Sequence, residues 1–469
     1  MTSPSASSLS LSAKLPDVSR QDIAANVRVL RESFASGALK DVAARKTLLK
    51  QLQTLMKEGE PAMKEALWLD LHKHPTEAYL AEIALVNAEI QDHLDYIDDW
   101  TAPKPAPTNL ANLPGLSYVH RDPLGVVCVI GTWNYPVNLL LLPLIAAISA
   151  GNCALVRLPG DDTTKHLNNV LISLFDQYVD ARYVRYVYGG VDETKAMLRE
   201  KYDLIFATGG CFLGKIVGDA FVKALQETVH AFYGQDVKKS DDYGRIVNER
   251  SYARLHAMLD KDRAHVSFGG DSDAGDKFIH PTIFNFKTDF AKFTSSAVMG
   301  QELFGPLLPI YYYAAGNLSM PIEFINSQEK PLALYVFTTS AATKTRVIRD
   351  TTAGSMMVND TMMQLTNPHV PFGGVGNSGM GAYHGKFGFE AFSHRKPVIH
   401  KYSLLDLPQR YAPYSPSSER MLRILQYPFS RAFFWKLKLV GYAVVVAAIA
   451  VAMKKSALDA KLMKLLKAE

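Results

Sequence analysis

Between residues 116 and 210, short runs rich in β-branched residues alternate with glycine or proline turns and helical stretches. The runs are "YVHRDPLGVVCVIG", "CALVRLP", "VRYVYGG" and "DLIFATGG". This alternation is typical of parallel strands joined by crossover helices, so the segment predicts a doubly wound α/β sheet. Ligands of such sheets bind at the carboxyl ends of the strands, which is where these turns fall.

The flanking regions have different patterns. Apolar residues recur at helical spacing through residues 22–100, for example at Leu48, Leu52 and Leu55, so this region is predicted to be helical. A Pro-rich connection, "APKPAPTNLANLPG", ends it. After Phe232, strand-like runs such as "KFIHPTIFNF" and "PLALYVFTTS" alternate with helical stretches, which predicts a second α/β segment.

Composition narrows the class of protein. A chain of 469 residues with 48% hydrophobic and 21% charged residues is expected to form two folded domains plus appendages. The net charge of +5 is spread without a Lys/Arg block, which argues against a nucleic-acid partner. Cys128, Cys153 and Cys211 form no metal-binding spacing, so no metal site is expected. The first twenty residues lack the apolar core of a signal peptide, which indicates folding in the cytosol.

The C-terminus contains an uncharged apolar run from Leu439 to Met453. As a helix it would extend roughly 22 Å, less than the ~30 Å hydrocarbon core of a bilayer. The preceding "AFFWKLK" lengthens the run, because lysines can snorkel and aromatic side chains favour the interface. A buried helix is the alternative, but the pattern favours a C-terminal hydrophobic helix that anchors the protein in a membrane.

Four motifs together resemble the aldehyde dehydrogenase superfamily. They are "GTWNYP" (Gly131–Pro136), "ELFGP" (Glu302–Pro306), "EKPLALYVF" (Glu329–Phe337) and "PFGGVGNSGMGAYHGKFGFEAFSHRKP" (Pro371–Pro397). The last motif and the hydrophobic tail resemble the class 3, fatty aldehyde dehydrogenase branch. The similarity covers about residues 22–400, and several distinctive motifs occur in the expected order.

The resemblance implies a fold and a function. The expected fold is α/β, with N-terminal helices and a Rossmann-type NAD(P)-binding domain (1–222), a truncated catalytic domain (223–396), a bridging segment (397–430) and a C-terminal membrane anchor (431–469). The implied function is NAD- or NADP-dependent oxidation of medium- or long-chain aldehydes to carboxylic acids by a homodimer. The tail would attach it to the endoplasmic reticulum or a peroxisome, with the folded part in the cytosol.

The resemblance also assigns roles around "GTWNYP". Asn134 matches the asparagine that, with a backbone N–H, stabilises the oxyanion of a thiohemiacetal, and such a donor contributes roughly 3 kcal/mol. A turn asparagine before Pro136 is the alternative. Thr132 and Trp133 are assigned to the cofactor site, and Trp133 could equally belong to the core.

Further along the chain, Glu302 and Phe304 match the pair that positions the nicotinamide ribose and ring. A helix-terminal carboxylate and a core aromatic residue are the alternatives. Asn359 matches a site-shaping asparagine, with a role in a turn as an equal alternative.

The cofactor site departs from the family pattern. Arg157 begins "RLPG", where the family has Lys-Pro-Ser-Glu, and is still expected to contact a ribose or a phosphate. Gly160 replaces the acid that would bind the adenosine 2′-hydroxyl, which removes one barrier to NADP.

The helix start in "TGGCFLG" is expected to bind the pyrophosphate through Gly209, Gly210, Cys211 and Gly214. Gly210 and Cys211 stand where the family has hydroxyl residues.

Two family motifs are missing. The resemblance implies a strand ending in Glu-Leu-Gly-Gly, which carries the general base, and a Gly-Gln-x-Cys loop, which carries the nucleophile. Neither occurs in this sequence, and roughly sixty residues are absent at a join near Val222–Leu225. We expect no substitute nucleophile, because Cys211 would face the pyrophosphate and the other two cysteines lie in apolar strand runs.

Three interpretations follow. In the first, the chain is an incomplete form of an aldehyde dehydrogenase, from a mis-joined gene model or a skipped exon, and is inactive. In the second, it is a membrane-tethered pseudoenzyme or dimerisation partner with weak nucleotide binding. In the third, it is a different cofactor-binding enzyme that uses other residues. We rank them in this order, since the motifs outside the gap are well kept.

Overall fold

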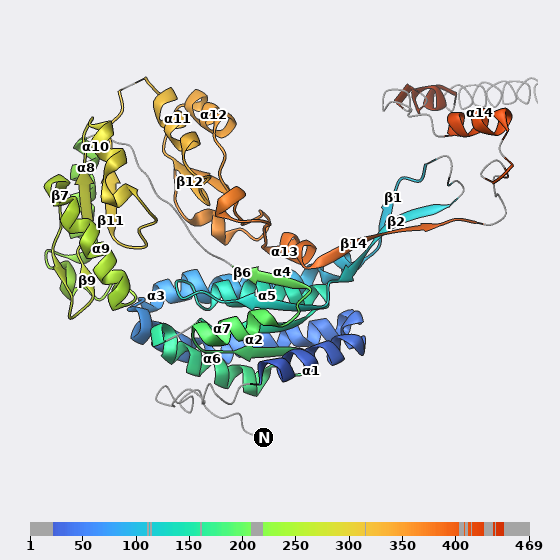
Figure 1. Cartoon of the computed structure of the whole chain (residues 1–469), viewed down its shortest axis with the longest axis horizontal. Helices are drawn as coiled ribbons and strands as arrows, with labels where there is room; N and C mark the ends of the chain where they lie inside the picture. Colours follow the sequence, from blue (N-terminus) through green and yellow to red (C-terminus); the bar gives the residue numbers. More distant parts are fainter. Residues whose placement is uncertain are drawn as a thin grey trace, which may run out of the picture. The chain divides into compact units, whose positions relative to one another are not determined.

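A computed structural model of the chain describes residues 22–109, 112, 115–159, 162–207, 219–314, 316–402, 408, 411–413, 415–425, 435–436 and 438–444 (Figure 1). Contacts divide the chain into two units. Unit 1 comprises Met1–Pro103 and His120–Lys396, and unit 2 comprises Lys104–Val119 and Pro397–Glu469.

The N-terminal part of unit 1 is helical, as the periodicity predicts. Asp22 and Asp41 begin the first two long helices by accepting hydrogen bonds from the backbone N–H groups of Ala25 and Ala43. A π-helical turn, η4 (Tyr79–Ile83), interrupts the region. The α-helices are α1 (Ile23–Ala35), α2 (Val42–Leu71), α3 (Pro75–Ala78) and α4 (Ala84–Thr101).

A four-stranded parallel sheet follows, with strand order β5-β4-β3-β6. It confirms the predicted parallel strands. Its strands are β3 (Val126–Ile130), β4 (Cys153–Arg157), β5 (Val184–Val187) and β6 (Leu204–Ala207). Its helices are α5 (Asn138–Ala150), α6 (Lys165–Tyr178) and α7 (Val191–Arg199).

The sheet is unevenly covered. Strands β3 and β4 are buried on both faces except at their last residues, as expected for inner strands of a parallel sheet. Every residue of α5 is buried, because this helix is apolar around its whole circumference. On the outer strand β6, Ile205 is 47% exposed and Ala207 is also exposed. One face of β6 is therefore uncovered within the described part of the chain.

The next part of unit 1 (residues 219–366) contains three small sheets and confirms the second α/β segment. Strands β10 (Thr282–Asn285) and β11 (Leu307–Ile310) are parallel, with β7 (Val266–Phe268) antiparallel to β10. The other two sheets pair β8 (Ser272–Asp273) with β9 (Phe278–Ile279), and β12 (Ala333–Val336) with β13 (Ser355–Val358). The helices are α8 (Asp219–Tyr233), α9 (Glu249–Lys261), α10 (Phe290–Ser295), α11 (Ser319–Ser327) and α12 (Ala341–Asp350).

The chain then reaches α13 (Gly385–Ala391) and β14 (Ser393–His400). Strand β14 belongs to a three-stranded sheet of order β1-β2-β14, with β1 (Lys104–Ala106) antiparallel to β2 (Leu116–Pro123). Unit 2 also contains α14 (Pro416–Leu425).

The predicted tail helix lies partly outside the described residues, which include 439–444 but not 445–469. Among the helices that the structure describes, none has the length and apolar character needed to cross a bilayer.

Candidate active site

The predicted site begins where β3 ends, at the loop Gly131–Pro136. The N–H of Gly131 donates a hydrogen bond of 2.9 Å to the carbonyl of Arg157 at the end of β4. A Cβ atom on Gly131 would lie 2.9 Å from Leu140 and 3.0 Å from that carbonyl. Glycine is therefore required for the ends of the two strands to meet here.

Thr132 and Asn134 form a local pair. The Thr132 hydroxyl donates to Oδ1 of Asn134 at 2.7 Å. This bond occupies the amide oxygen of Asn134, and the Nδ2 group is the part of this amide that can donate. The oxyanion role given to Asn134 stays a prediction.

A buried ion pair fixes the backbone of the same loop. Lys73 lies in the turn after α2, and its Nζ contacts Glu82 at 2.6 Å and donates to the carbonyl of Asn134 at 3.0 Å. The Lys73 ammonium also lies 4.3 Å from the centre of the Tyr135 ring. Both charged side chains are buried, so the Asn134 carbonyl is held by a cation that has little access to water.

Glu82 extends this support to the start of α5. Its Oε2 accepts hydrogen bonds from the N–H groups of Val137 and Asn138, at 3.1 and 2.9 Å. Burial raises the pKa of Glu82, while the Lys73 ammonium and these N–H groups oppose that shift. Glu82 lies within the π-helical turn η4, a feature often found at functional sites.

The second predicted loop, Glu302–Pro306, meets the first through aromatic rings. Trp133 and Phe304 lie with ring centroids 5.6 Å apart. Phe304 adopts φ of 47°, a left-handed conformation that is costly for a bulky residue, and it is 42% exposed. Arg254 of α9 donates to the carbonyls of Glu302 and Leu303 and so fixes the loop.

The Glu302 carboxyl has a perturbed environment. Burial raises its pKa, and the nearby Arg254 guanidinium opposes that effect. The structure thus brings Thr132, Trp133 and Asn134 together with the Phe304 loop. The binding roles given to Glu302 and Phe304 stay predictions.

Arg157 is held by hydrogen bonds within the protein, and its predicted contact with a nucleotide stays a prediction. Its Nε donates to the Thr194 hydroxyl at 2.8 Å, and its Nη2 donates to the carbonyl of Gly189 at 3.2 Å. These contacts tie the guanidinium at the end of β4 to the first turn of α7 and to the loop before it. A positive charge therefore stands at the carboxyl ends of the strands, where a nucleotide phosphate binds in such sheets.

Several predicted positions fall outside the described residues. They are Gly160 and the helix-start residues Gly209, Gly210, Cys211 and Gly214.

Asn359 lies in a turn. It has φ of 63°, and its Oδ1 accepts a hydrogen bond of 2.7 Å from the N–H of Thr338. The turn role, one of the two alternatives, is thus present in the structure.

The two described cysteines belong to the core. Cys128 on β3 and Cys153 on β4 are fully buried, as the sequence predicts. Burial raises the pKa of each thiol to about 12. Neither can act as a nucleophile near neutral pH, because the reactive form is the thiolate.

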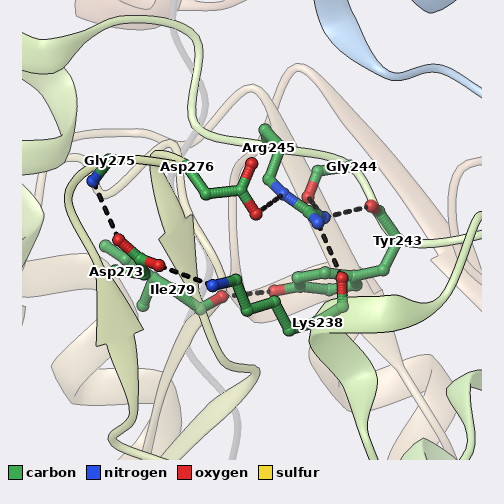
Figure 2. Close-up of polar contacts among 8 residues, drawn as sticks. All are labelled: Lys238, Tyr243, Gly244, Arg245, Asp273, Gly275, Asp276 and Ile279. Carbon is green, nitrogen blue, oxygen red and sulfur yellow. Dashed lines mark hydrogen bonds and ion pairs between the residues drawn. The ribbon is translucent and has the colours of Figure 1, made fainter.

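A polar cluster orders the chain after α8 (Figure 2). Arg245 contacts Asp276 at 2.9 Å and donates to the carbonyls of Tyr243 and Lys238. Lys238 contacts Asp273, which also accepts from the N–H of Gly275. The cluster ties the loop between α8 and α9 to the β8–β9 hairpin.

Sequence reasoning missed Lys73, Glu82 and Arg254. A signal existed for Glu82, since it precedes Val86, Ile90 and His93 at helical spacing on a buried face. A carboxylate at an apolar periodic position requires a buried partner. The sequence alone does not identify that partner.

Comparisons with known proteins agree with the family resemblance found in the sequence. A sequence model described as the aldehyde dehydrogenase family matches residues 2–219 and 211–398. The 4,4'-diaponeurosporen-aldehyde dehydrogenase of Staphylococcus aureus is 34% identical over 441 residues, covering 81% of this chain and 94% of that protein. The dimeric NADP-preferring aldehyde dehydrogenase of Rattus norvegicus is 34% identical over 461 residues, covering 86% and 99%. Family 3 member A2 from the same species is 35% identical over 435 residues, covering 80% and 88%.

Solved structures have the same fold. The substrate-bound structure of Staphylococcus aureus AldH superposes with a TM-score of 0.81 at 31% identity, covering 87% of this chain and all of that one. A Bacillus cereus aldehyde dehydrogenase in complex with NAD+ gives a TM-score of 0.67 at 20% identity, covering 81% and 89%. The second likeness shows the fold alone.

Proposed function

Because the chain belongs to the aldehyde dehydrogenase family, we propose that its fold is that of an enzyme for NAD(P)-dependent oxidation of medium- or long-chain aldehydes to carboxylic acids. In the form given by this sequence, we propose that it binds nucleotide without oxidising aldehyde. The family is shown by the matched residues and by the class 3 relatives. The lack of activity is inferred from the site.

The proposal rests on the positions of the three cysteine thiols. Aldehyde oxidation in this family requires a thiolate that attacks the carbonyl and forms a tetrahedral adduct for hydride transfer. Cys128 and Cys153 are buried in strands, each with a pKa raised to about 12. Cys211, the third, is placed by its motif at the pyrophosphate. An aldehyde beside Asn134 would therefore find an oxyanion donor without a nucleophile.

Two further observations support a missing segment. The alignment with the rat NADP-preferring enzyme extends over 461 positions, whereas 86% of 469 residues is about 403. About 58 positions of the alignment thus lack a residue of this chain. The family model matches in two parts that overlap at residues 211–219. Just before this point, β6 is an outer strand with one uncovered face among the residues that the structure describes. Loss of the following strand and its covering elements would leave this arrangement.

The described residues fit a dinucleotide at the ends of β3 and β4. When bound, NAD or NADP would supply the hydride acceptor. Gly131 permits close approach of the backbone, and Arg157 provides a fixed positive charge. The Glu302 loop and Trp133 would hold the nicotinamide half. Since Gly160 provides no acid for the 2′-hydroxyl, we propose weak binding with little preference for NAD over NADP.

Membrane attachment and dimerisation complete the proposal. The apolar run 439–453 supports a C-terminal anchor in the endoplasmic reticulum or a peroxisome, with the folded part in the cytosol. The resemblance to class 3 enzymes supports a homodimer. A non-catalytic, membrane-tethered partner is the second candidate function, favoured by the same buried thiols.

Two measurements on the purified full-length protein test the proposal. Absorbance of reduced nucleotide should show no aldehyde-dependent turnover with NAD or NADP. Calorimetric titration should detect binding of both nucleotides, and Arg157→Ala should weaken it several-fold. Arg182→Ala, an exposed arginine that pairs with Asp180 within its own turn, is the matched control and should leave binding unchanged. Turnover that disappears in Cys211→Ala would contradict the proposed inactivity.

A further inference from the structure

Electric charge is divided unequally between the two units. Unit 2 contains 13 Lys and Arg residues against 4 Asp and Glu, a net charge of +9. Since the whole chain carries +5, unit 1 carries −4. The expectation of an evenly spread charge is therefore wrong at the level of the units. The smaller unit is strongly basic.

Part of this charge lies on helix α14, which is labelled in Figure 1. Arg420 and Arg423 lie three residues apart, on one side of the helix, and both are exposed. The only acid of α14, Glu419, contacts Arg423 at 2.7 Å in a solvent-exposed pair. Such pairs are weak, so Arg423 can exchange this partner for an external anion. Met421, next to Arg420, is also exposed, so cationic and apolar side chains adjoin on this helix.

The helical residues that follow combine the same two properties. All described residues from 435 to 444 are exposed. They include Trp435, Leu439, Val440 and Tyr442, whose exposure ranges from 52% to 67%. Lys436 and Lys438 alternate with them in sequence. Large apolar side chains interspersed with lysines, and with aromatic residues at the border, are the composition of a membrane interface.

We propose that unit 2 binds the surface of anionic lipid bilayers, with Arg420, Arg423, Lys436 and Lys438 contacting lipid phosphates or carboxylates. This inference deepens the proposed membrane attachment and rests on it. The apolar residues 439–444 would enter the acyl boundary beside the same headgroups. Basic residues near a bilayer bind negatively charged lipids additively, and amphipathic helices bind more tightly when both forces act together.

Charge complementarity alone would also fit a nucleic acid. A phosphate backbone, however, would leave Leu439, Val440 and Val444 uncovered, whereas a bilayer covers them and neutralises the lysines together. The lipid bilayer is therefore the better match to the exposed side chains.

Sedimentation of the full-length protein with vesicles tests the inference. The probes are phosphatidylcholine vesicles with and without phosphatidylserine at about 30 mol%. We expect the bound fraction to correspond to roughly ten-fold stronger partitioning when phosphatidylserine is present. Raising the salt from about 0.1 to about 0.5 M should remove most of that gain.

The test variant is Arg420→Glu/Arg423→Glu, which should lower partitioning into phosphatidylserine vesicles about ten-fold and leave neutral vesicles unaffected. The matched control, Lys195→Glu/Lys223→Glu, makes the same change of net charge on exposed helical lysines of unit 1 that also have acidic neighbours. It should bind like the unmodified protein.

The outcomes separate the two levels of the proposal. Equal binding to both kinds of vesicle would overturn the anionic-lipid inference and leave membrane attachment standing. Binding to neither would overturn both. Equal losses in the two double variants would also overturn the inference, because the effect would then come from overall charge. Tighter binding to a short RNA than to phosphatidylserine vesicles would reassign the surface to nucleic acid.

Discussion

The two α/β parts of unit 1 differ in how their sheets are completed. The first region, residues 22–103 and 120–207, contains a four-stranded parallel sheet whose inner strands are buried within a large core. Residues 219–366, the second region, contain separate sheets of two or three strands and two smaller cores. A single continuous sheet stabilises the whole region cooperatively, whereas short separate sheets depend on local clusters. The first region should therefore be the more stable, and the second should unfold first.

The largest expected effect is in the first region. Lys73→Met would leave the Glu82 carboxylate buried without its cation, which typically costs about 3–5 kcal/mol of unfolding free energy. Urea denaturation followed by tryptophan fluorescence measures it, since Trp68, Trp100 and Trp133 all lie in this region. The exposed Lys223→Met is the control and should change stability by less than about 0.5 kcal/mol. A loss below about 1 kcal/mol would show that water reaches Glu82.

A core truncation in the second region sharpens the comparison. Leu255 of α9 is fully buried, so Leu255→Ala should cost about 2–4 kcal/mol within that region. The second region contains no tryptophan. Far-ultraviolet circular dichroism should therefore report an earlier transition in the variant, while the tryptophan transition stays in place. Coincident shifts of both probes would mean that the two regions unfold as one unit.

The polar cluster of Figure 2 should contribute less. Arg245→Met removes the contact with Asp276 and three hydrogen bonds to backbone carbonyls, and should cost about 1–3 kcal/mol. Hydrogen exchange would locate the effect in the loop before α9 and in the β8–β9 hairpin. Arg263→Met, which removes an exposed pair with Asp260, serves as the control and should change exchange little. Faster exchange throughout β3 and β4 would contradict a local role.

The smallest expected effect is a dependence on pH. Burial lowers the pKa of His384 from its usual value of 6.5, against an opposing effect of Glu89. The unfolded chain therefore binds a proton at this histidine more readily than the folded chain does. As a result, the free energy of unfolding falls as the pH drops from about 6.5 towards the folded-state pKa. The slope for one group is at most about 1.4 kcal/mol per pH unit. His384→Gln should reduce the change of the urea midpoint with pH between about pH 7 and 5.5. An unchanged pH dependence would exclude His384 as its source.

Local patterns in the sequence predict much of this structure. The runs that become β3 to β6 are apolar and end in glycine or proline turns, so their strand character and parallel direction follow from short-range spacing. The burial of Cys128 and Cys153 follows from the same runs. The pair formed by Thr132 and Asn134 lies within one predicted loop.

Contacts between distant segments were not predictable in this way. Arg157 contacts Thr194, which is 37 residues away in the sequence, and Lys73 contacts the Asn134 carbonyl, which is 61 residues away. No periodicity links such positions, because each contact depends on how whole helices and strands pack. Asn359 shows an intermediate case, since the sequence left two roles open and its positive φ identifies the turn.

The outer strand β6 has a consequence for the life of the protein in a cell. Within the described residues, one edge of β6 has no neighbouring strand, and this edge and the exposed Ile205 can mediate association between newly made chains. Chaperones and proteases compete for such surfaces before folding is complete. The amount of protein that accumulates would then depend on the relative rates of quality control and aggregation rather than on the stability of the folded state.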